Sequence, residues 1–280
     1  MSTTQPGVAV VTGATGGIGR WIALRLAQAG HPVVLVGRDR TRGEAAQAWV
    51  SRQSGVTPEL MLADLSSLAA TRALGQGIAA RHPRVSLLVN NAGVFRARRE
   101  RTAEGHDMVL AVNHLSPFVL TRELEGALRA GAPSRIVTVG SSTSDRARID
   151  PANLELERRW NLLRAYSQSK LAVMITTFEW ARRLDGSGVV ANVVHPGAVA
   201  TGLVRTPGII GLAWRLMAPW IRTEEQGADT PSHVALAPEL AGVTGQYFKD
   251  RKAIEPNRLA RDPVLAGQVW RATEHLVGGN

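Results

Sequence analysis

The sequence predicts an α/β fold in which helices cover both faces of a doubly wound parallel sheet. Three observations support this prediction. Short aliphatic runs alternate with longer amphipathic runs, a glycine-rich turn follows the first aliphatic run, and 280 residues with 44% hydrophobic composition suit one large core. No internal repeat, low-complexity tract or linker divides the chain. We therefore expect a single domain over residues 1–280 whose ligands bind at the carboxyl ends of the strands.

Six runs rich in Val, Ile and Leu are the expected strands, because each is short and bounded by turn residues, and "GQYF" is a candidate for a last one. The first run, "VAVVTG", follows Pro6 and Gly7 and ends at glycines. The amphipathic segment after it has Ile18 and Ile22 on one stripe and stops at Gly30. In chain order the expected strands cover 8–13, 32–37, 59–64, 85–91, 135–141, 189–197 and 245–248, and further helices are expected at 41–53, 66–81, 104–130 and 153–184.

The composition excludes several classes of protein. Because there is no cysteine, disulfides, thiolate catalysis and cysteine-ligated metals are ruled out, and no metal site is expected. No apolar run approaches the roughly 18 residues of a membrane-spanning helix. The N-terminal stretch "MSTTQPG" is polar and lacks the charged-then-apolar order of a secretory signal. We therefore expect a cytoplasmic protein without stable membrane insertion.

The formal net charge of +10 raises the question of nucleic-acid binding, because clustered cations are typical of phosphate-binding surfaces. Almost all of the cations are arginine, since Lys170, Lys249 and Lys252 are the only lysines. The arginines are scattered among acidic residues, and the densest cluster, "RARRERTAEG", covers only 96–105. This pattern favours a solvated surface and no nucleic-acid partner.

The stretch "TGATGGIGR" connects the first expected strand to the first expected helix. Its glycines fit two spacings: Gly13, Gly17 and Gly19 match T-G-x-x-x-G-x-G, while Gly13, Gly16 and Gly19 match G-x-x-G-x-x-G. Glycines allow a tight turn here and let backbone amides approach a pyrophosphate. Any tight turn uses glycine, but the position after the first strand of an alternating chain indicates a dinucleotide-binding, Rossmann-type fold.

The end of the second expected strand discriminates between the two nicotinamide dinucleotides. An acidic residue there binds the 2′-hydroxyl of NAD, whereas arginine suits the 2′-phosphate of NADP. Arg38 and Arg40 favour NADP(H), and Arg20 can add a third cation. Asp39 supports the alternative, NAD(H), because its carboxylate can accept from a ribose hydroxyl. We expect NADP(H).

Tyr166 and Lys170 lie four positions apart in an expected helix and therefore share one helical face. With only two tyrosines in the chain, chance places a Y-x-x-x-K pair roughly 2% of the time. Carbonyl reduction needs a proton donor, and a tyrosine serves only if its pKa falls from about 10 toward neutrality. The lysine ammonium, together with an oxidised nicotinamide, can lower that pKa. The pair therefore predicts chemistry at a carbonyl or alcohol.

Two further polar positions are candidates for the same site. Ser141 follows the strand "RIVTV" and can donate to a substrate carbonyl, with its neighbour Ser142 as the alternative. Asn113 lies in an apolar helical run, where it is either a satisfied core amide or a functional residue. Pro117 favours the functional role, because its missing N–H leaves the Asn113 carbonyl without a helical donor and free to hold a water.

Six motifs occur in one order along the chain. They are the glycine turn at 12–20, "NNAG" at 90–93, "NHLSPF" at 113–118, "VGSS" at 139–142, "YSQSK" at 166–170 and "HPGAVATGL" at 195–203. In these motifs and their order the sequence resembles the short-chain dehydrogenase/reductase family, and within it the retinol-dehydrogenase-like branch. The resemblance covers nearly the whole chain and implies a dinucleotide cofactor and reversible reduction of a ketone or aldehyde.

The resemblance implies a role for each matching residue. Tyr166 is the general acid or base, Lys170 orients the nicotinamide ribose, Ser141 polarises the carbonyl and Asn113 anchors a proton-relay water. Taken alone, "NNAG" and "HPG" fit ordinary turns after strands equally well. The implied cofactor-binding residues are Gly13, Thr15, Gly17, Ile18, Gly19, Arg38, Asp64, Leu65, Asn91, Ala92, Gly93, Tyr166, Lys170, Pro196, Gly197, Val199 and Thr201.

The segment 202–225 is rich in Trp, Leu and Ile and is broken by Pro207 and Pro219. The resemblance implies a mobile substrate lid here, and its composition suggests a bulky apolar substrate. Core packing and contact with a membrane surface are the alternatives. We therefore expect an NADP(H)-dependent oxidoreductase acting on a bulky apolar carbonyl or alcohol, with a C-terminal extension after the last strand. A non-catalytic dinucleotide-binding sensor or scaffold is the alternative, and a homo-oligomer is left open.

Overall fold

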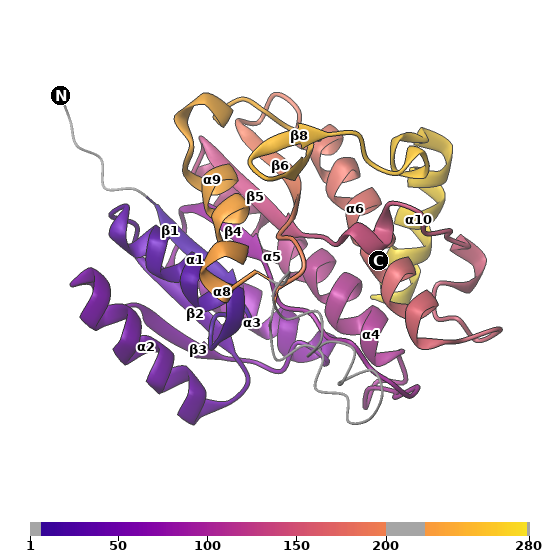
Figure 1. Cartoon of the computed structure of the whole chain (residues 1–280), viewed down its shortest axis with the longest axis horizontal. Coiled ribbons are helices and arrows are strands. Elements are labelled where there is room, and N and C mark those ends of the chain that lie inside the picture. The colour runs from indigo at the N-terminus through magenta and orange to yellow at the C-terminus, as the bar shows by residue number, and fades with distance from the viewer. Residues whose placement is uncertain (1–6, 200–221, 279–280) are drawn as a thin grey trace.

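The computed structural model describes residues 7–199 and 222–278, and a β-sheet lies at the centre of this part of the chain (Figure 1). The strand order is β3-β2-β1-β4-β5-β6-β7-β8, and every neighbouring pair is parallel except β7 and β8. The predicted α/β fold is confirmed. The strands are β1 Val8–Thr12, β2 Val33–Gly37, β3 Glu59–Leu62, β4 Val85–Asn90, β5 Ser134–Val139, β6 Val189–His195, β7 Tyr247–Lys249 and β8 Lys252–Ile254.

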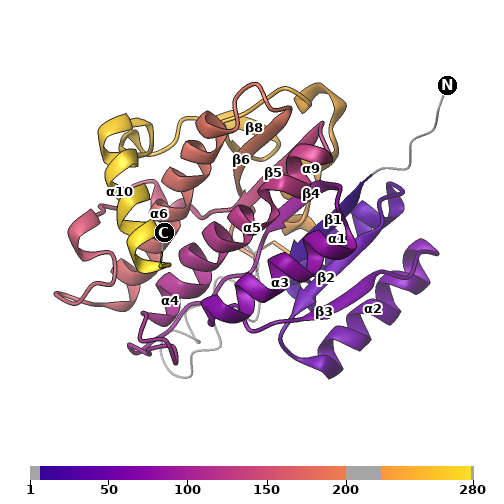
Figure 2. The same cartoon turned by 180° about the vertical axis from the view of Figure 1, so that it is seen from behind.

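Helices cover both faces of the sheet. α1, α2, α8 and α9 lie toward the viewer in Figure 1, and α3, α5 and α10 lie toward the viewer in Figure 2. Because side chains alternate along a strand, Ala9 and Val11 of β1 pack with the first group and Val8 and Val10 with the second. The helices are α1 Gly17–Gln28, α2 Arg40–Ser54, α3 Leu68–Arg81, α4 Met108–Leu110, α5 Ser116–Ala130, α6 Leu162–Arg183, α8 Glu224–Gly227, α9 Asp229–Leu236 and α10 Pro263–Leu276.

None of the helices within 7–199 and 222–278 combines the length and the apolar character needed to cross a membrane.

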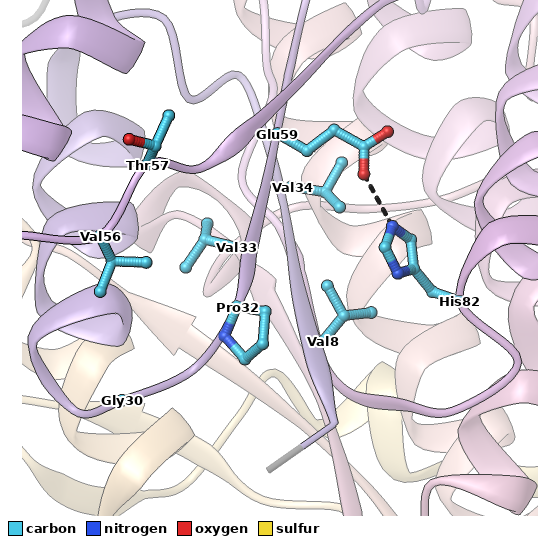
Figure 3. A pocket seen from close by; sticks show the side chains of 9 residues that line it. All are labelled: Val8, Gly30, Pro32, Val33, Val34, Val56, Thr57, Glu59 and His82. Atoms are coloured by element: carbon cyan, nitrogen blue, oxygen red, sulfur yellow. Dashed lines mark hydrogen bonds and ion pairs between the residues drawn. The ribbon is translucent and has the colours of Figure 1, made fainter. Parts of the chain in front are cut away.

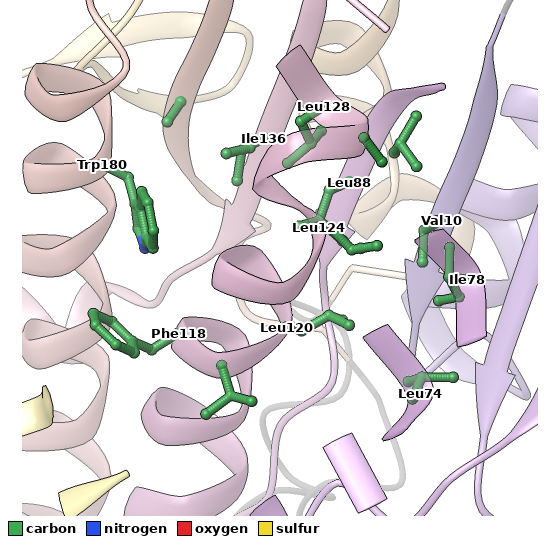
Figure 4. Packing of buried hydrophobic residues seen from close by; sticks show 14 of the residues in the cluster. Val10, Leu74, Ile78, Leu88, Phe118, Leu120, Leu124, Leu128, Ile136 and Trp180 are labelled. Carbon is green, nitrogen blue, oxygen red and sulfur yellow. The ribbon is translucent and has the colours of Figure 1, made fainter. Parts of the chain in front are cut away.

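Aromatic side chains join α10 to the rest of the core. Phe118 of α5 and Trp180 of α6 lie close together among the buried leucines of α5 (Figure 4). The ring of Trp270 on α10 packs against both, with centroids 4.7 Å from Phe118 and 4.9 Å from Trp180. Aromatic pairs at these distances stabilise a core beyond their buried area. The expected C-terminal extension therefore contains a helix that belongs to the core, which the sequence analysis did not predict.

Two helices begin four or more residues later than predicted. The helices expected from 104 and 153 begin at Met108 and Leu162. The residue before each, Asp107 or Asn161, caps it by accepting backbone N–H groups of the first turn. The residues before α6 also include Leu156 with φ of 49°, a left-handed conformation that a continuous helix excludes.

The last predicted strand, 245–248, is present as β7, but the antiparallel β8 was missed. The two strands are joined through Asp250 and Arg251, whose φ angles of 51° and 63° fit the mirror-image turns of short hairpins. Asp-Arg carries a weak turn signal compared with Asn-Gly or Asp-Gly, which explains the omission.

The strand order reverses between β1 and β4, which brings the segments after these two strands to one edge of the sheet. The opposite edge, at the amino ends of the strands, has a small pocket lined by Val8, Pro32 and Val33 (Figure 3). In it Glu59 pairs with His82 at 2.7 Å. The predicted catalytic and cofactor-binding residues do not line this pocket, so the functional site belongs to the carboxyl edge.

Candidate functional site

The glycine turn after β1 has the backbone that glycine requires. Gly13 and Gly17 have φ of 65° and 57°, and a Cβ on Gly19 would lie 2.4 Å from the Gly13 carbonyl oxygen. Gly16 has φ of 171°, an extended conformation open to any residue. The structure therefore favours the Gly13, Gly17, Gly19 spacing. The first turn of α1 contains no acidic residue and no side-chain cap, so its N–H groups are available to an anion.

We expect Gly19→Ala to weaken dinucleotide binding at least tenfold, because the added Cβ must displace the turn that approaches the pyrophosphate. Titration of the purified protein with NADPH, followed by nucleotide fluorescence, measures the change. Gly126→Ala is the matched control. Gly126 is an exposed residue of α5 with open space around its Cβ position, so the variant should retain wild-type affinity. Equal affinities for both variants and the wild type would exclude the turn as the binding site.

The segment after β4 is tied to the end of β1. The Asn91 side-chain amide donates to the Thr12 carbonyl at 2.9 Å, and the Thr12 hydroxyl accepts from the backbone N–H groups of Asn91 and Ala92 at 3.0 Å. A Cβ on Gly93 would lie 3.4 Å from Asn113 Oδ1 and 3.5 Å from Lys170 Nζ. The "NNAG" turn therefore connects the glycine turn to two of the predicted catalytic residues.

The end of β2 presents arginine to solvent next to the glycine turn. Arg38 is exposed, while Thr15 of the turn lies directly against Gly37. The carboxylate of Asp39 accepts the Arg42 backbone N–H at 2.9 Å and so caps α2. This contact gives Asp39 a structural role that the sequence analysis did not consider.

Two other arginines concern the predicted binding of the 2′-phosphate at this corner of the site. Arg42 lies there without having been predicted, and Arg20, which was predicted, makes other contacts. The guanidinium of Arg42 lies 3.0 Å from the position of a Cβ on Gly16, so Arg42 is the second cation beside the turn. Arg20 instead stacks on Trp49, with 4.4 Å between guanidinium and ring centroid, and lies 3.8 Å from Glu224. No sequence pattern singled out Arg42, because its position depends on the orientation of α2 relative to β2.

The predicted adenine-side residues follow β3. Asp64 is exposed and its carboxylate accepts the Ser66 N–H at 2.9 Å. The Leu65 side chain is buried in the core cluster that also contains Leu68. Asp64 therefore presents its side chain at the surface, whereas Leu65 fixes the segment by packing inward.

Tyr166 and Lys170 meet on α6 as the spacing predicted. Lys170 Nζ lies 5.9 Å from the centroid of the Tyr166 ring and donates to the Val139 carbonyl at 2.8 Å. Burial lowers the pKa of Lys170 from its usual 10.5 to about 8. Burial also raises the pKa of Tyr166, although a hydrogen bond with the Ser141 side chain acts to lower it. The lowering of the tyrosine pKa by Lys170 together with an oxidised nicotinamide stays a prediction.

Ser141 is the serine that lies beside the tyrosine. The Ser141 side chain acts to lower the pKa of Tyr166, and its hydroxyl oxygen accepts from the Thr143 backbone N–H at 3.3 Å. Ser142 is exposed and begins a short 3₁₀ turn, Ser142–Ser144. The geometry thus favours Ser141 over Ser142, and Thr143 holds the hydroxyl in place.

Asn113 lies in a π-helical turn, Ala111–Leu115, that sequence patterns do not reveal. Its side chain accepts the Val94 N–H at 2.7 Å and donates to the Val94 carbonyl at 3.0 Å and the Ser169 hydroxyl at 3.1 Å. Both side-chain N–H groups are therefore engaged, one of them in holding the chain after Gly93. The role of the Asn113 main-chain carbonyl in holding a water stays a prediction.

Two residues of the site were not singled out from the sequence. Ser169 donates to the Tyr166 carbonyl at 2.8 Å and accepts from Asn113, so it links the two candidates. The ring of Phe95 packs edge-on against Tyr166, with centroids 5.3 Å apart. Ser169 does lie inside the "YSQSK" motif, whereas the place of Phe95 depends on the path of the chain after β4.

The segment after β6 completes the site. Gly197 has φ of 90°, and a Cβ there would lie 2.7 Å from Arg222 Cδ. Val199 and Ile18 both lie within 3.1 Å of the Cβ position of Gly227, so the segment reaches the first turn of α1. Pro196 is buried. Of the residues predicted here, Thr201 and most of the proposed lid at 202–225 lie outside the described residues.

Among the residues that the structure describes, no group of three His, Cys, Asp or Glu side chains is arranged to hold a metal ion.

Comparisons with known proteins agree with this geometry. The sequence model of the short chain dehydrogenase family matches residues 7–207. Human retinol dehydrogenase 11 is 40% identical over 280 residues, which cover 99% of this chain and 88% of the relative. Both findings concern the segments that carry the glycine turn, Asn113, Ser141 and the Tyr166–Lys170 pair.

Two solved structures with bound cofactor have the same fold. A short chain dehydrogenase from Burkholderia cenocepacia in complex with NADP has a TM-score of 0.71 and 29% identity, covering 87% of this chain and 96% of that one. An actinorhodin polyketide ketoreductase variant with NADPH has a TM-score of 0.68 and 27% identity, covering 89% and 97%. These two proteins of the same fold thus bind NADP or NADPH.

Proposed function

Because the chain belongs to the short-chain dehydrogenase family, we propose that it is an NADP(H)-dependent oxidoreductase that reduces the ketone or aldehyde of a bulky apolar small molecule, or oxidises the matching alcohol. One observation carries the proposal: Tyr166, Lys170, Ser141 and Asn113 converge at the sheet edge where the glycine turn lies. The alternative, a non-catalytic dinucleotide-binding sensor or scaffold, would need the glycine turn but would not need these four side chains to converge.

The residues present fit a dinucleotide. The α1 N–H groups suit the pyrophosphate, and the close approach of Asn91 and Gly13 to Gly19 leaves room only for glycine there. Arg38 and Arg42 suit a 2′-phosphate. When bound, a dihydronicotinamide supplies the hydride for the carbonyl carbon.

In the proposed reduction the Tyr166 hydroxyl donates its proton to the carbonyl oxygen as negative charge develops there. The Ser141 hydroxyl donates a hydrogen bond to the same oxygen. Lys170, held by the Val139 carbonyl, stabilises the phenolate that remains and orients the ribose. The Asn113 carbonyl holds a water that returns a proton to the site.

NADP(H) is proposed over NAD(H) on the contacts at the end of β2. The exposed Arg38 guanidinium has no ion-pair partner within 7–199 and 222–278, whereas the Asp39 carboxylate is engaged in capping α2. The two solved structures named above contain NADP or NADPH. An apolar substrate is supported by Phe95 beside Tyr166 and by the relative, which is a retinol dehydrogenase.

A screen of bulky ketones, aldehydes and alcohols, followed separately with NADPH and NADH by nucleotide absorbance, tests the proposal. We expect turnover of at least one apolar carbonyl with NADPH. Tight NADPH binding without turnover across the panel would favour the sensor.

We expect Arg38→Ser to raise the KM for NADPH about tenfold and to change the KM for NADH less than twofold, because one charge-assisted contact to the 2′-phosphate is worth about 1.5 kcal/mol or more. Steady-state kinetics with both cofactors measure the change. Arg52→Ser, in the exposed last turn of α2, should leave both values unchanged. A wild-type protein that prefers NADH would overturn the assignment of Arg38.

A further inference from the structure

Trp160 lies on the segment between Ser141 and α6 and packs against the same apolar cluster as Tyr166. We propose that Trp160 is a specificity-determining residue: its indole forms a fixed apolar wall of the substrate site, and the carboxylate of Asp107 holds it in place. The inference rests on the proposed role of Tyr166 as the proton donor.

The wall is a small apolar cluster around the tyrosine. Trp160 and Tyr166 both pack against the buried side chains of Val109, Leu156 and Ala165. Trp160 and Tyr166 are themselves only partly buried, so part of each ring remains accessible at this edge of the sheet. In the proposed wall, a carbonyl substituent that lies on the side of this cluster meets the indole.

The orientation of the indole is fixed by one buried carboxylate. The Trp160 N–H donates to Asp107 Oδ2 at 2.9 Å, while Asp107 Oδ1 accepts the backbone N–H groups of Val109 and Leu110 at 3.0 and 3.1 Å. Asp107 is only 3% exposed, so all of its strong interactions are with the protein. The same residue thus caps α4, which leads into the turn of Asn113, and positions the wall.

The segment that carries Trp160 is itself clamped onto the loop before α4. Glu155 accepts the Asp107 backbone N–H at 2.7 Å and pairs with His106 at 2.8 Å. Glu157 pairs with Arg101 at 2.7 Å and Arg99 at 3.1 Å.

Two backbone conformations also show that the segment is held by its surroundings. Leu156 and Arg159 have φ of 49° and 61° without being glycine, and such conformations persist only where the surrounding contacts determine them. Leu156 is 2% exposed within the cluster around the tyrosine. The wall is therefore preorganised, and it limits the width of the group next to the reacting carbonyl.

Trp160→Ala tests the proposal. The assay compares kcat/KM for a ketone with a ring next to the carbonyl and for a straight-chain aldehyde, both with NADPH. Unfolded protein lowers both values of kcat/KM by the same factor, so their ratio does not depend on the folded fraction of the preparation. A loss of stability alone therefore leaves the ratio unchanged. We expect the ratio to shift about tenfold or more toward the ring-substituted ketone, the size expected for a changed apolar contact.

Two further variants keep the test decisive if Trp160→Ala fails to fold. Trp160→Phe retains an aromatic ring but loses the N–H, and Asp107→Asn replaces the acceptor with an amide; both should shift the ratio in the same direction by a smaller factor. Trp49→Ala removes a tryptophan that packs on Trp21 in a different cluster from Trp160 and Tyr166, and it should leave the ratio at the wild-type value.

The outcomes separate the two proposals. A wild-type protein that turns over neither substrate contradicts the proposed function. If the wild type turns over these substrates but folded Trp160→Phe and Asp107→Asn give the same ratio as Trp49→Ala, the proposed role of Trp160 is wrong. The proposed function then stands.

Discussion

Tyr166→Phe should lower kcat by about 10²–10⁴-fold, because it removes the only group proposed to donate a proton to the carbonyl oxygen. The substitution deletes one hydroxyl and retains the ring that packs against Phe95. We therefore expect NADPH affinity to stay within about threefold of the wild type, a change of less than 1 kcal/mol. Single-turnover kinetics with a substrate from the screen, together with NADPH titration, separate the two effects.

The second tyrosine provides the matched control. Tyr247 is fully buried, and its hydroxyl donates to Asp145 at 3.1 Å. Tyr247→Phe removes the same atom from a different environment and should cost about 1 kcal/mol or more of stability while leaving kcat within a few-fold of the wild type. If Tyr166→Phe turns over at the wild-type rate, or if Tyr247→Phe loses as much activity, the proposed role of Tyr166 is wrong.

The direction of the tyrosine pKa defines what the cofactor must contribute. In the chain alone burial raises the pKa of Tyr166, and the hydrogen bond with Ser141 only partly opposes it. A positively charged, oxidised nicotinamide favours the phenolate, as does the Lys170 ammonium. The tyrosine should therefore become a proton acceptor for alcohol oxidation only in the complex, so the pH dependence of cofactor binding and of turnover should differ.

Much of the site could be predicted from the sequence because local chemistry determines it. The glycine turn needs backbone conformations that few residues adopt, and the spacing of Tyr166 and Lys170 follows from the period of one helix. The order of the strands then brings the turn and the pair to one edge.

The remaining features depend on contacts between distant segments. The Val139 carbonyl receives Lys170 only because β5 and α6 pack together, and Ser169 reaches Asn113 only through the π-helical turn. The sequence offered Arg20 as a third cation, but its guanidinium stacks on Trp49 of α2. Such pairings follow from how helices pack on the sheet, which periodicity in one segment does not specify.

The buried lysine is the other residue whose change should have a large effect. Lys170→Met keeps an unbranched side chain of similar length and removes the charge. We expect kcat/KM to fall about 10²-fold or more, since the variant loses both the partner of the tyrosine and a ligand of the ribose, each worth about 1.5 kcal/mol or more. Steady-state kinetics at pH 7 measure the loss, and Lys252→Met, at an exposed position in β8, should behave as the wild type.

Lys170→Met should change stability at pH 7 far less than activity, and it should remove a pH dependence of stability. Since the pKa of Lys170 falls from 10.5 in the unfolded chain to about 8 in the fold, the unfolded state binds more protons between these values. The free energy of unfolding of the wild type should therefore rise with pH across this window, by up to about 3 kcal/mol.

The methionine variant should lack this rise and at pH 7 be nearly as stable as the wild type, because relief of the buried charge offsets the loss of the bond to Val139. Urea unfolding from pH 7 to pH 10 measures both curves. Parallel curves for the wild type and Lys170→Met would show that the buried ammonium does not control this dependence. An inactive variant with a flat curve would show that Lys170 controls it and is required for activity.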